Sequence, residues 1–323
     1  MTQPALAVLG TGMMGPGMAV TFALADHPVA LWGRTDASVQ RGLAAVDAAL
    51  ALLAGAEVVA RPAADAARAR IHGETDLAAA VRDAAVVFES IAEDLEVKRA
   101  LYARLETLVG ADTILASNTS ALRITEIAAG LQRPQRVVTA HFWNPPHLMP
   151  LVDVVRGERT SQATVDTVRA LLLRARKKPV LVQKDVPGQL GNRLQHALNR
   201  EAFYIVQQGI ASAEDVDTAI KYGPGFRWPI LGPNEAADVA GLDLVLAVQA
   251  YTVPALCSGE ESVALLRGLV ARGELGVKSG RGFYDWSRRD PAAVKAARDR
   301  FLVQRLKDLL AAESAATGEG EHP

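Results

Sequence analysis

The sequence is almost without cysteine, and it lacks both an excess of charge and a long apolar run. Cys257 is the single thiol in 323 residues, so the chain can form neither an internal disulfide nor a cysteine-based zinc site. Lysine and arginine (35) nearly balance aspartate and glutamate (36), and the net charge of −1 gives no whole-chain field to gather nucleic acid or anionic lipid. Any anionic ligand must therefore be held by local groups.

The N-terminus has no basic segment before its short apolar run, and no later run approaches about 20 uncharged apolar residues, the length that spans a membrane. No cluster of His, Cys, Asp and Glu has a recognisable metal-ligand spacing. We therefore expect a cytoplasmic protein without a membrane, nucleic-acid or metal partner. The 50% of hydrophobic and 22% of charged residues are typical of an ordinary globular chain, and the length corresponds to roughly two domains.

The first half of the chain alternates short β-rich runs with segments of helical length. Residues 4–10 form an apolar run that ends in glycine, and residues 29–32 form a second. Further β-rich runs occupy residues 85–89, 113–116, 137–142, 151–155 and 179–183. This alternation predicts a Rossmann-like α/β domain, with a doubly wound, mainly parallel sheet covered by helices on both faces. Residues 36–70, rich in Ala and Arg, predict a helical excursion from this sheet.

Beyond residue 185 the β-rich runs stop, and helical patterns continue to the end of the chain. Predicted helices cover about residues 189–208, 212–222, 235–253, 260–272 and 291–313, with breaks at glycine and proline. We therefore expect a Rossmann-like domain over residues 1–185 and an all-α C-terminal domain over residues 186–315. The polar tail, residues 316–323, is expected to be disordered.

A glycine-rich turn stands where a dinucleotide-binding fold places one. Gly10-Thr11-Gly12-Met13-Met14-Gly15 follows the first strand directly and opens the first helix. In a GxGxxG turn the first glycine permits a tight turn, the second lets the backbone approach a pyrophosphate, and the third allows close helix–strand packing. Free N–H groups at the helix start would hold the phosphates. We therefore predict that these glycines and the two methionines bind NAD or NADP; the alternative is a glycine-rich turn without a ligand.

The end of the second predicted strand bears on the choice of cofactor. An acidic residue there normally binds the ribose 2′-hydroxyl of NAD, but this chain has Gly33-Arg34-Thr35. Without a carboxylate the 2′-phosphate of NADP is not repelled, and Arg34 can bind it with its guanidinium fork. The sequence therefore slightly favours NADP over NAD, with Gly33 and Arg34 in the cofactor site. Alternatively, Arg34 stacks on adenine or faces solvent, and Asp36 accepts from the ribose.

Polar residues near the ends of two further strands predict a catalytic site. Ser117-Asn118-Thr119-Ser120 follows one β-rich run, and the next leads into the segment His141-Phe142-Trp143-Asn144-Pro145-Pro146. Asp153 follows amid apolar residues, where an acid needs a partner, and His141 is the obvious candidate. An imidazole titrates near neutral pH and can take the proton of an alcohol while hydride leaves the carbinol carbon, and a carboxylate fixes its tautomer. The alternative is a buried structural histidine.

These motifs, in this order and spacing, resemble the L-3-hydroxyacyl-CoA dehydrogenase family over about residues 3–285. The matching segments are the GxGxxG turn and residues 91–98 (IAEDLEVK), 117–120 (SNTS), 141–146 (HFWNPP), 184–188 (KDVPG), 191–194 (GNRL) and 276–284 (GVKSGRGFY). The resemblance implies that His141 is the catalytic base, that Asp153 orients it, and that Ser120 and Asn192 contact the substrate oxygen. It also implies that the helical domain forms a homodimer and that four polar residues lie near the cofactor, namely Glu93, Lys98, Asn118 and Asn144. Taken alone, Ser120 and Asn192 could equally cap helices.

Three features depart from the fatty acyl-CoA members of this family. Their acid partner is usually glutamate, and Asp153 is one methylene shorter, which would weaken or lengthen its contact with His141. Residues 36–70, where those enzymes present lysines to the CoA phosphates, contain no lysine and only Arg41, Arg61, Arg68 and Arg70. Thirdly, the segment Gly225-Phe226-Arg227-Trp228 places an arginine in a turn between helices. In this respect the chain resembles the branch of the family that includes lambda-crystallin (L-gulonate dehydrogenase) and carnitine dehydrogenase, whose substrates carry a free carboxylate. Arg227 could bind such a carboxylate, or it could pair with Glu235 or Asp238.

The sequence thus predicts an NAD(P)-dependent oxidoreductase that interconverts an L-3-hydroxyl and a 3-keto group on a small molecule by hydride transfer. The substrate is a short acyl-CoA or a small 3-hydroxy acid. One alternative is a dehydrogenase specific for a free hydroxy carboxylic acid held by Arg227. Another is a non-catalytic, crystallin-like protein that binds nucleotide, and the presence of Ser120, His141 and Asn192 argues against it.

Overall fold

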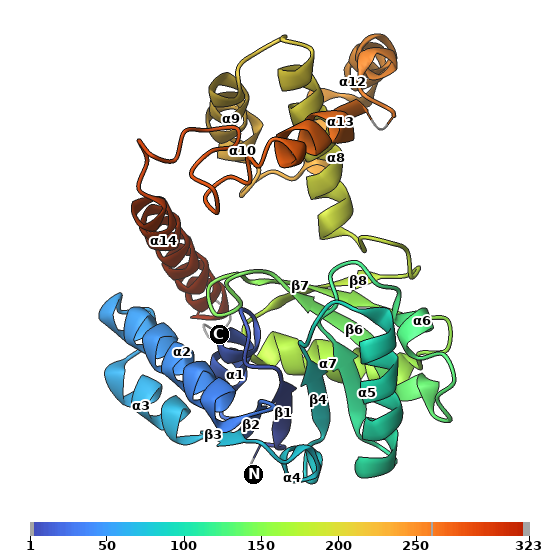
Figure 1. Ribbon diagram of the computed structural model, residues 1–323, viewed down its shortest axis with the longest axis vertical. Helices are drawn as coiled ribbons and strands as arrows, with labels where there is room; N and C mark the ends of the chain where they lie inside the picture. Colours follow the sequence, from blue (N-terminus) through green and yellow to red (C-terminus); the bar gives the residue numbers. More distant parts are fainter. Residues whose placement is uncertain (1–2, 260, 319–323) are drawn as a thin grey trace. The chain divides into compact units, whose positions relative to one another are not determined.

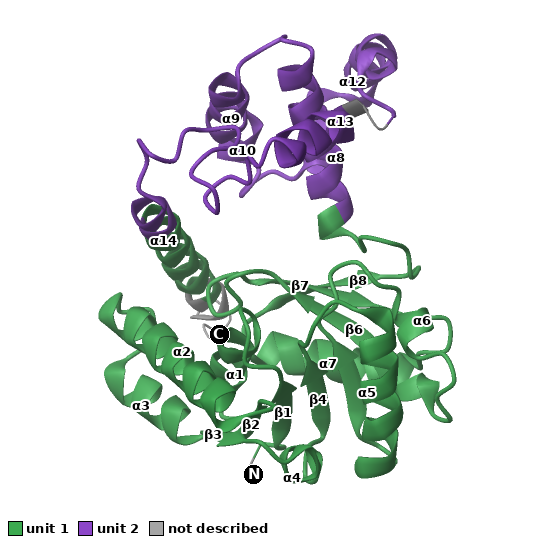
Figure 2. Cartoon of the chain, viewed as in Figure 1, with its two compact units in different colours: residues 1–192, 297–323 green, residues 193–296 purple. Residues whose placement is uncertain are grey.

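The computed structural model describes residues 3–259 and 261–318 (Figure 1). Its contacts divide the chain into two compact units (Figure 2). Unit 1 comprises residues 1–192 and 297–323, and unit 2 comprises residues 193–296. The expected α/β and all-α parts are both present, but the chain returns to unit 1 at its C-terminal end.

Unit 1 is built on an eight-stranded sheet with the strand order β3-β2-β1-β4-β5-β6-β7-β8. The strands are β1 (Leu6–Leu9), β2 (Val29–Trp32), β3 (Ile71–Glu74), β4 (Val86–Glu89), β5 (Ile114–Ser117), β6 (Val137–Phe142), β7 (Leu151–Val155) and β8 (Lys178–Val182). Neighbouring strands are parallel except β6 and β7, which are antiparallel. The order runs outward from β1 in both directions, which confirms the expected doubly wound, mainly parallel sheet.

Strand β3 is not among the strands that the sequence predicts. It is a four-residue edge strand, and Ile71 is its single buried residue, so neither an alternating nor a continuous apolar run marks it. It pairs with β2 in register, Val29 lying opposite Ile71. The helical excursion over residues 36–70 therefore ends by returning to the sheet.

Helices cover both faces of the sheet, as Figure 1 shows. One buried cluster joins the sheet to α1 (Gly15–Ala23), α2 (Asp36–Gly55), α3 (Arg61–Ala69) and α7 (Gln162–Arg174). The other joins it to α4 (Leu77–Val81), α5 (Leu95–Leu108) and α6 (Ile124–Ile127). A short 3₁₀ helix, η1 (Pro134–Arg136), precedes β6. Alternate residues of β1 belong to opposite clusters, Leu6 to the first and Ala7 to the second, as the two-residue period of a strand requires.

Helix α2 is long and apolar enough, by length and composition alone, to cross a membrane. In this structure its apolar side is packed, because Val46, Leu50 and Leu53 belong to the first buried cluster. Asp47 forms an ion pair with Arg68 of α3. The helix therefore covers the sheet of unit 1.

Unit 2 is helical throughout its regular elements. They are α8 (Gly191–Gln207), which begins at the end of unit 1, and α9 (Ala213–Tyr222), α10 (Pro224–Arg227), α11 (Pro233–Ala240), α12 (Leu242–Thr252), η2 (Val253–Ala255) and α13 (Glu261–Ala271). The helix predicted over residues 235–253 is two helices, because Gly241 between them has φ of 94°, which a right-handed helix excludes. Among the described residues of unit 2, only Cys257 and Ser262 are buried.

Helix α14 (Pro291–Gly318) corrects the predicted extent of the second domain. From residue 297 onward it belongs to unit 1. Val303 is buried in the first cluster, Leu306 packs against it, and the Nζ atom of Lys307 donates to the carbonyl of Ala56 (3.1 Å). The sequence pattern shows that this segment is helical but not which unit its apolar side contacts. Residues 316–318 of the expected tail are helical, and residues 319–323 lie outside the described part of the chain.

Candidate active site

His141 and Asp153 face each other across the antiparallel strands β6 and β7. The register of the two strands places them directly opposite, and Nδ1 of His141 lies 3.2 Å from Oδ2 of Asp153. Both residues are buried, at 7% and 0% exposure. Next to an ionised carboxylate, which only accepts hydrogen bonds, a neutral imidazole in this geometry donates through Nδ1 and keeps the lone pair of Nε2. The expected contact is confirmed. Its length is at the long end of the hydrogen-bond range, as expected for aspartate, which is shorter than glutamate.

The same Oδ2 atom of Asp153 also accepts a hydrogen bond from Nε1 of Trp143 (3.4 Å). The first residue of α8 closes this site: a Cβ atom at Gly191 would lie 2.5 Å from Cζ2 of Trp143 and 3.4 Å from Oδ2 of Asp153. Oδ1 of Asp153 has no hydrogen-bond partner among the described residues. Gly191 therefore has a packing role that the sequence motif alone did not reveal.

A network of charged side chains, of which Lys98 and Glu89 are buried and Glu93 is exposed, supports the turn after β5. Glu93 Oε1 accepts from Thr119 Oγ1 (2.6 Å) and from the backbone N–H groups of Ser120 (2.9 Å) and Ala121 (3.1 Å). Burial opposes ionisation of Glu93, but the bond from Thr119, the charge of Lys98 and these N–H groups together hold its pKa below the ordinary value. Glu93 thus fixes the backbone that presents Ser120.

Lys98 lies between two carboxylates and is 1% exposed. Its Nζ atom is 2.5 Å from Oε1 of Glu89 and 3.4 Å from Oε2 of Glu93. Glu89 also accepts from Ser117 Oγ (2.7 Å). Lys98 is thus buried behind Glu93, and its expected contact with the cofactor stays a prediction.

Asn192 and Asn118, two further residues expected at this edge of the sheet, make different contacts. Asn192 meets Ser120, because its Nδ2 atom donates to the Ser120 carbonyl (2.9 Å). Asn118 instead joins two strand ends: its Nδ2 donates to Ser90 Oγ (3.2 Å) and its Oδ1 accepts from the N–H of Phe142 (2.7 Å).

Asn144 is exposed beside these strand ends, immediately before a cis peptide bond to Pro145. Gln189 is a buried residue that sequence reasoning missed, and its Nε2 donates to the carbonyl of Thr119 (2.6 Å). The one signal for it is its position directly after the Pro187-Gly188 turn.

The glycine-rich turn has the form that a dinucleotide needs. Gly10 has φ of 117°, and a Cβ atom there would lie 2.3 Å from the carbonyl oxygen of Ser90. A Cβ at Gly15 would lie 1.8 Å from the carbonyl oxygen of Gly10, so the helix start and the strand end meet without side chains. Gly12 borders open space, Met13 is 76% exposed and Met14 is partly buried. The turn therefore leaves room for a pyrophosphate at the start of α1.

Arg34 and Arg227 are both exposed. Gly33 is buried against Ser38, and Arg34 follows it just before the N-terminus of α2. Arg227 ends α10 in unit 2, and no ion pair of Arg227 occurs among the described residues. Glu235, its suggested partner, instead accepts from the N–H of Gly232 (2.8 Å). In the described part of the chain, no group of three or more His, Cys, Asp or Glu side chains is arranged to hold a metal ion.

Family models match most of the chain. The model of the 3-hydroxyacyl-CoA dehydrogenase NAD binding domain matches residues 5–186, and that of the 3-hydroxyacyl-CoA dehydrogenase C-terminal domain matches residues 188–286. The fold and these two family matches together define an NAD-dependent dehydrogenase that acts on a hydroxyl group. The chain belongs to the 3-hydroxyacyl-CoA dehydrogenase family, as its motifs predict.

Relatives in this family differ in substrate. The chain is 34% identical over 298 residues to 5-formyl-3-hydroxy-2-methylpyridine 4-carboxylate 5-dehydrogenase of Mesorhizobium japonicum, covering 92% of this chain and 96% of the relative. It is 35% identical to 3-hydroxybutyryl-CoA dehydrogenase of Clostridioides difficile (88% and 99% covered) and 39% identical to L-carnitine dehydrogenase of Streptomyces griseus (73% and 69% covered). A crystal structure of the pyridine-acid 5-dehydrogenase, described as an NAD+ dependent dismutase, superposes with a TM-score of 0.88 at 32% identity, covering 94% of this chain and 98% of that chain.

We predict that His141→Gln lowers kcat by a factor of about 10² to 10⁴, because it removes the expected base. Asp153→Asn should also lower kcat strongly, since an amide can no longer fix the Nδ1–H tautomer. Steady-state kinetics with a hydroxyl substrate that the wild type oxidises measures both losses. Quenching of protein fluorescence by NADH should show unchanged cofactor affinity in both variants. A His141→Gln enzyme with turnover within two-fold of wild type would refute the assignment of the base.

We also predict that His147 makes the fold sensitive to acid. Burial, reinforced by the charge of Lys177, lowers the pKa of His147 from 6.5 to about 4. The unfolded chain therefore binds a proton between these values that the folded chain does not, so the free energy of unfolding falls as the pH drops from 6.5 to 4. At 1.36 kcal/mol per pKa unit, this contribution is at most about 3 kcal/mol.

Urea unfolding of wild type and His147→Gln across this pH range measures the difference. The variant should show a flatter decline, whereas His72→Gln, at an exposed histidine, should match the wild type. Parallel declines in wild type and His147→Gln would contradict the prediction.

Proposed function

We propose that the chain is an NAD-dependent dehydrogenase for a small, free hydroxy carboxylic acid. The observation that carries this proposal is Arg227, an exposed guanidinium with no ion-pair partner among the described residues. A guanidinium fork binds a carboxylate through two parallel hydrogen bonds. The names of two relatives support this class, because one acts on a pyridine carboxylate and one on carnitine.

Binding of a CoA thioester has less support in this chain. Helices α2 and α3 present no lysine, and two of the arginines in or just after them are already paired. Arg68 lies 2.5 Å from Asp47, and Arg70 lies 2.7 Å from Asp26. A short 3-hydroxyacyl-CoA remains the competing substrate, as the 3-hydroxybutyryl-CoA dehydrogenase relative shows for the family.

The mechanism follows from the pairing of His141 with Asp153. Because Nδ1 donates to the carboxylate, Nε2 is the atom that accepts the proton of the substrate hydroxyl. The carboxylate stabilises the imidazolium that results. Ser120 and Asn192, which meet at the Ser120 carbonyl, orient the substrate oxygen. A nicotinamide cofactor held at the glycine-rich turn would supply the hydride acceptor.

The free-acid proposal predicts a selective effect of Arg227→Met. Loss of a charge-assisted, two-bond contact should raise KM for a 3-hydroxy acid at least ten-fold and leave KM for a 3-hydroxyacyl-CoA within two-fold. A screen of both substrate classes, followed by kinetics of this variant, measures the effect. Lys221→Met, at an exposed cation of α9, is the control and should change neither value. Preference of the wild type for the thioester, or an unchanged KM for the acid, would exclude the carboxylate contact.

The NAD binding domain and the NAD+ dependent relative support NAD as cofactor. We propose in addition that Arg34 allows the chain to use NADP. The residues that follow β2, Gly33-Arg34-Thr35, include no acidic side chain, and Arg34 is exposed there. Asp36, in the first turn of α2, is the competing acceptor for a 2′-hydroxyl.

Arg34→Ala should therefore lower the ratio of kcat/KM for NADP to kcat/KM for NAD by about ten-fold, since one charge-assisted contact to phosphate is lost. Arg41→Ala, in the same segment, is the matched control and should leave the ratio unchanged. A wild type with a strong preference for NAD, and a ratio that Arg34→Ala does not alter, would refute the contribution of Arg34.

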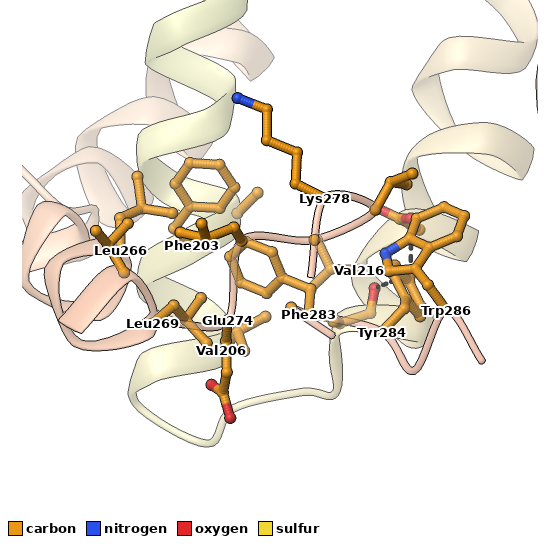
Figure 3. Close-up of a pocket in the computed structure, with 18 residues that line it drawn as sticks. Phe203, Val206, Val216, Leu266, Leu269, Glu274, Lys278, Phe283, Tyr284 and Trp286 are labelled. Atoms are coloured by element: carbon orange, nitrogen blue, oxygen red, sulfur yellow. Dashed lines mark hydrogen bonds between the residues drawn. The ribbon is translucent and has the colours of Figure 1, made fainter. Parts of the chain in front are cut away.

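We propose that the chain works as a homodimer that pairs through unit 2. The apolar side chains of α12 are exposed, with Leu246 at 70% and Tyr251 at 89%. The same unit contains a cavity of about 620 Å³. Phe203 and Phe283 line it (Figure 3), and their stacked rings have centroids 5.3 Å apart. Exposed apolar surface on this scale is typical of an interface and not of a monomer surface. A second copy of the chain would supply the burial that this unit lacks.

A further inference from the structure

Lys177 is buried under the loop that joins the two strands of the catalytic pair. Its Nζ atom donates to the carbonyls of Pro146 (2.6 Å) and Met149 (3.0 Å), and the residue is 7% exposed. The chain leaves α7 through Arg176, whose φ of 55° turns it toward β8. The N–H of Lys177 donates to the carbonyl of Leu172 (2.9 Å). Local backbone geometry therefore fixes where this side chain starts.

The loop that Lys177 holds, residues 143–150, begins beside the catalytic carboxylate. Trp143, its first residue, donates to Oδ2 of Asp153. The loop turns tightly, because the N–H groups of Leu148 and Met149 both donate to the carbonyl of Pro145. A shift of this turn would move Trp143, which is one of the two side chains that hydrogen-bond to Asp153.

The same loop packs directly on α1, the helix that opens from the glycine-rich turn. A Cβ atom at Gly17 would lie 2.9 Å from Cδ of Pro146 and 3.1 Å from Nδ1 of His147. Thr21 of α1 donates to the carbonyl of Pro146 as well, at 3.4 Å. The Pro146 carbonyl is thus held from two sides, by Thr21 and by the much shorter bond from Lys177.

The partners of Lys177 differ from those of the other buried lysine. Lys98 is balanced by two carboxylates, whereas the described hydrogen bonds of the Lys177 side chain go to backbone carbonyls. Burial lowers the pKa of Lys177 to about 7. An apolar side chain of similar length would fill this space without the cost of burying an amine. What the amine adds is two directed bonds to the loop.

We propose that Lys177 is a positioning residue for the reaction: by fixing the carbonyls of Pro146 and Met149, it sets the loop that holds Asp153 against His141. The proposal rests on the proposed role of His141 as base. Its effect falls on kcat, because the alignment of the base with the hydroxyl depends on the carboxylate behind it. Cofactor affinity depends on the glycine-rich turn, where Lys177 makes no described hydrogen bond, so the change in the Kd for NADH should be smaller than the change in kcat.

A cavity of about 330 Å³ gives access to this position. It is lined by Lys177 and His147 and by apolar side chains that include Leu53, Val58 and Leu306. Truncation of Lys177 to alanine would enlarge this cavity by the space of a propylamine chain. A small amine added to the solution can therefore occupy the vacated site and bind the two carbonyls.

The test uses Lys177→Ala and Lys177→Met with Lys178→Ala as the matched control, since the adjacent Lys178 is half exposed and pairs with Glu313. Both Lys177 variants should lose at least ten-fold in kcat, with the Kd for NADH within three-fold of wild type. Millimolar ethylamine should restore kcat of Lys177→Ala at least five-fold. It should not act on Lys177→Met, where the methionine fills the site. Lys178→Ala should stay within two-fold throughout.

If Lys177→Ala does not fold, as circular dichroism would show, Lys177→Met alone decides the question through its kcat. A kcat of Lys177→Met within two-fold of wild type would overturn the proposal. So would a loss in folded Lys177→Ala that ethylamine leaves unchanged. The assay uses whichever substrate the wild type oxidises, so a wild type that oxidises the acyl-CoA alone refutes the free-acid substrate and leaves the test of Lys177 intact.

Discussion

The contact between His141 and Asp153 is the interaction on which the rest of the site depends. It exists because β7 runs against β6 in an otherwise parallel sheet, so that a carboxylate on one strand lies directly opposite an imidazole on the other. A buried carboxylate is costly without a partner, and the imidazole supplies one while its own tautomer is fixed. The surrounding residues hold this pair and the backbone beside it. Glu93 fixes the turn at Ser120, and Gly191 leaves room for Trp143 behind Asp153.

Much of the fold could be predicted because its signals are local. The apolar runs, the glycine-rich turn and the helical patterns are each read within a short window, and the order of strands follows from the rules for parallel sheets. The sequence pattern did not predict strand β3, because Ile71 is its single buried residue. The packing of α14 on unit 1 was not predicted either. Its hydrogen bond from Lys307 to the Ala56 carbonyl joins residues 251 positions apart, and no local sequence pattern encodes such a contact.

The site shows the same division. The pairing of His141 with Asp153 was predictable, because a lone acid in an apolar strand requires a partner of complementary chemistry. The hydrogen bond from Gln189 to the backbone carbonyl of Thr119 was not predictable, because the two residues are 70 positions apart in the sequence. Lys98 is expected near the cofactor, which stays a prediction, but its burial between Glu89 and Glu93 was not predictable from the motif. Sequence motifs thus identify which residues gather at the edge of the sheet, but tertiary packing decides which contacts each of them makes there.

The most direct test of the account is the protonation state of His141 in solution, measured by ¹⁵N NMR of protein with labelled histidine, at a pH where the ring is neutral. The account predicts that Nδ1 carries the proton and Nε2 does not, and that Asp153→Asn abolishes this preference. A neutral ring protonated at Nε2 in the wild type would contradict it, because that nitrogen could not then accept a proton from the substrate.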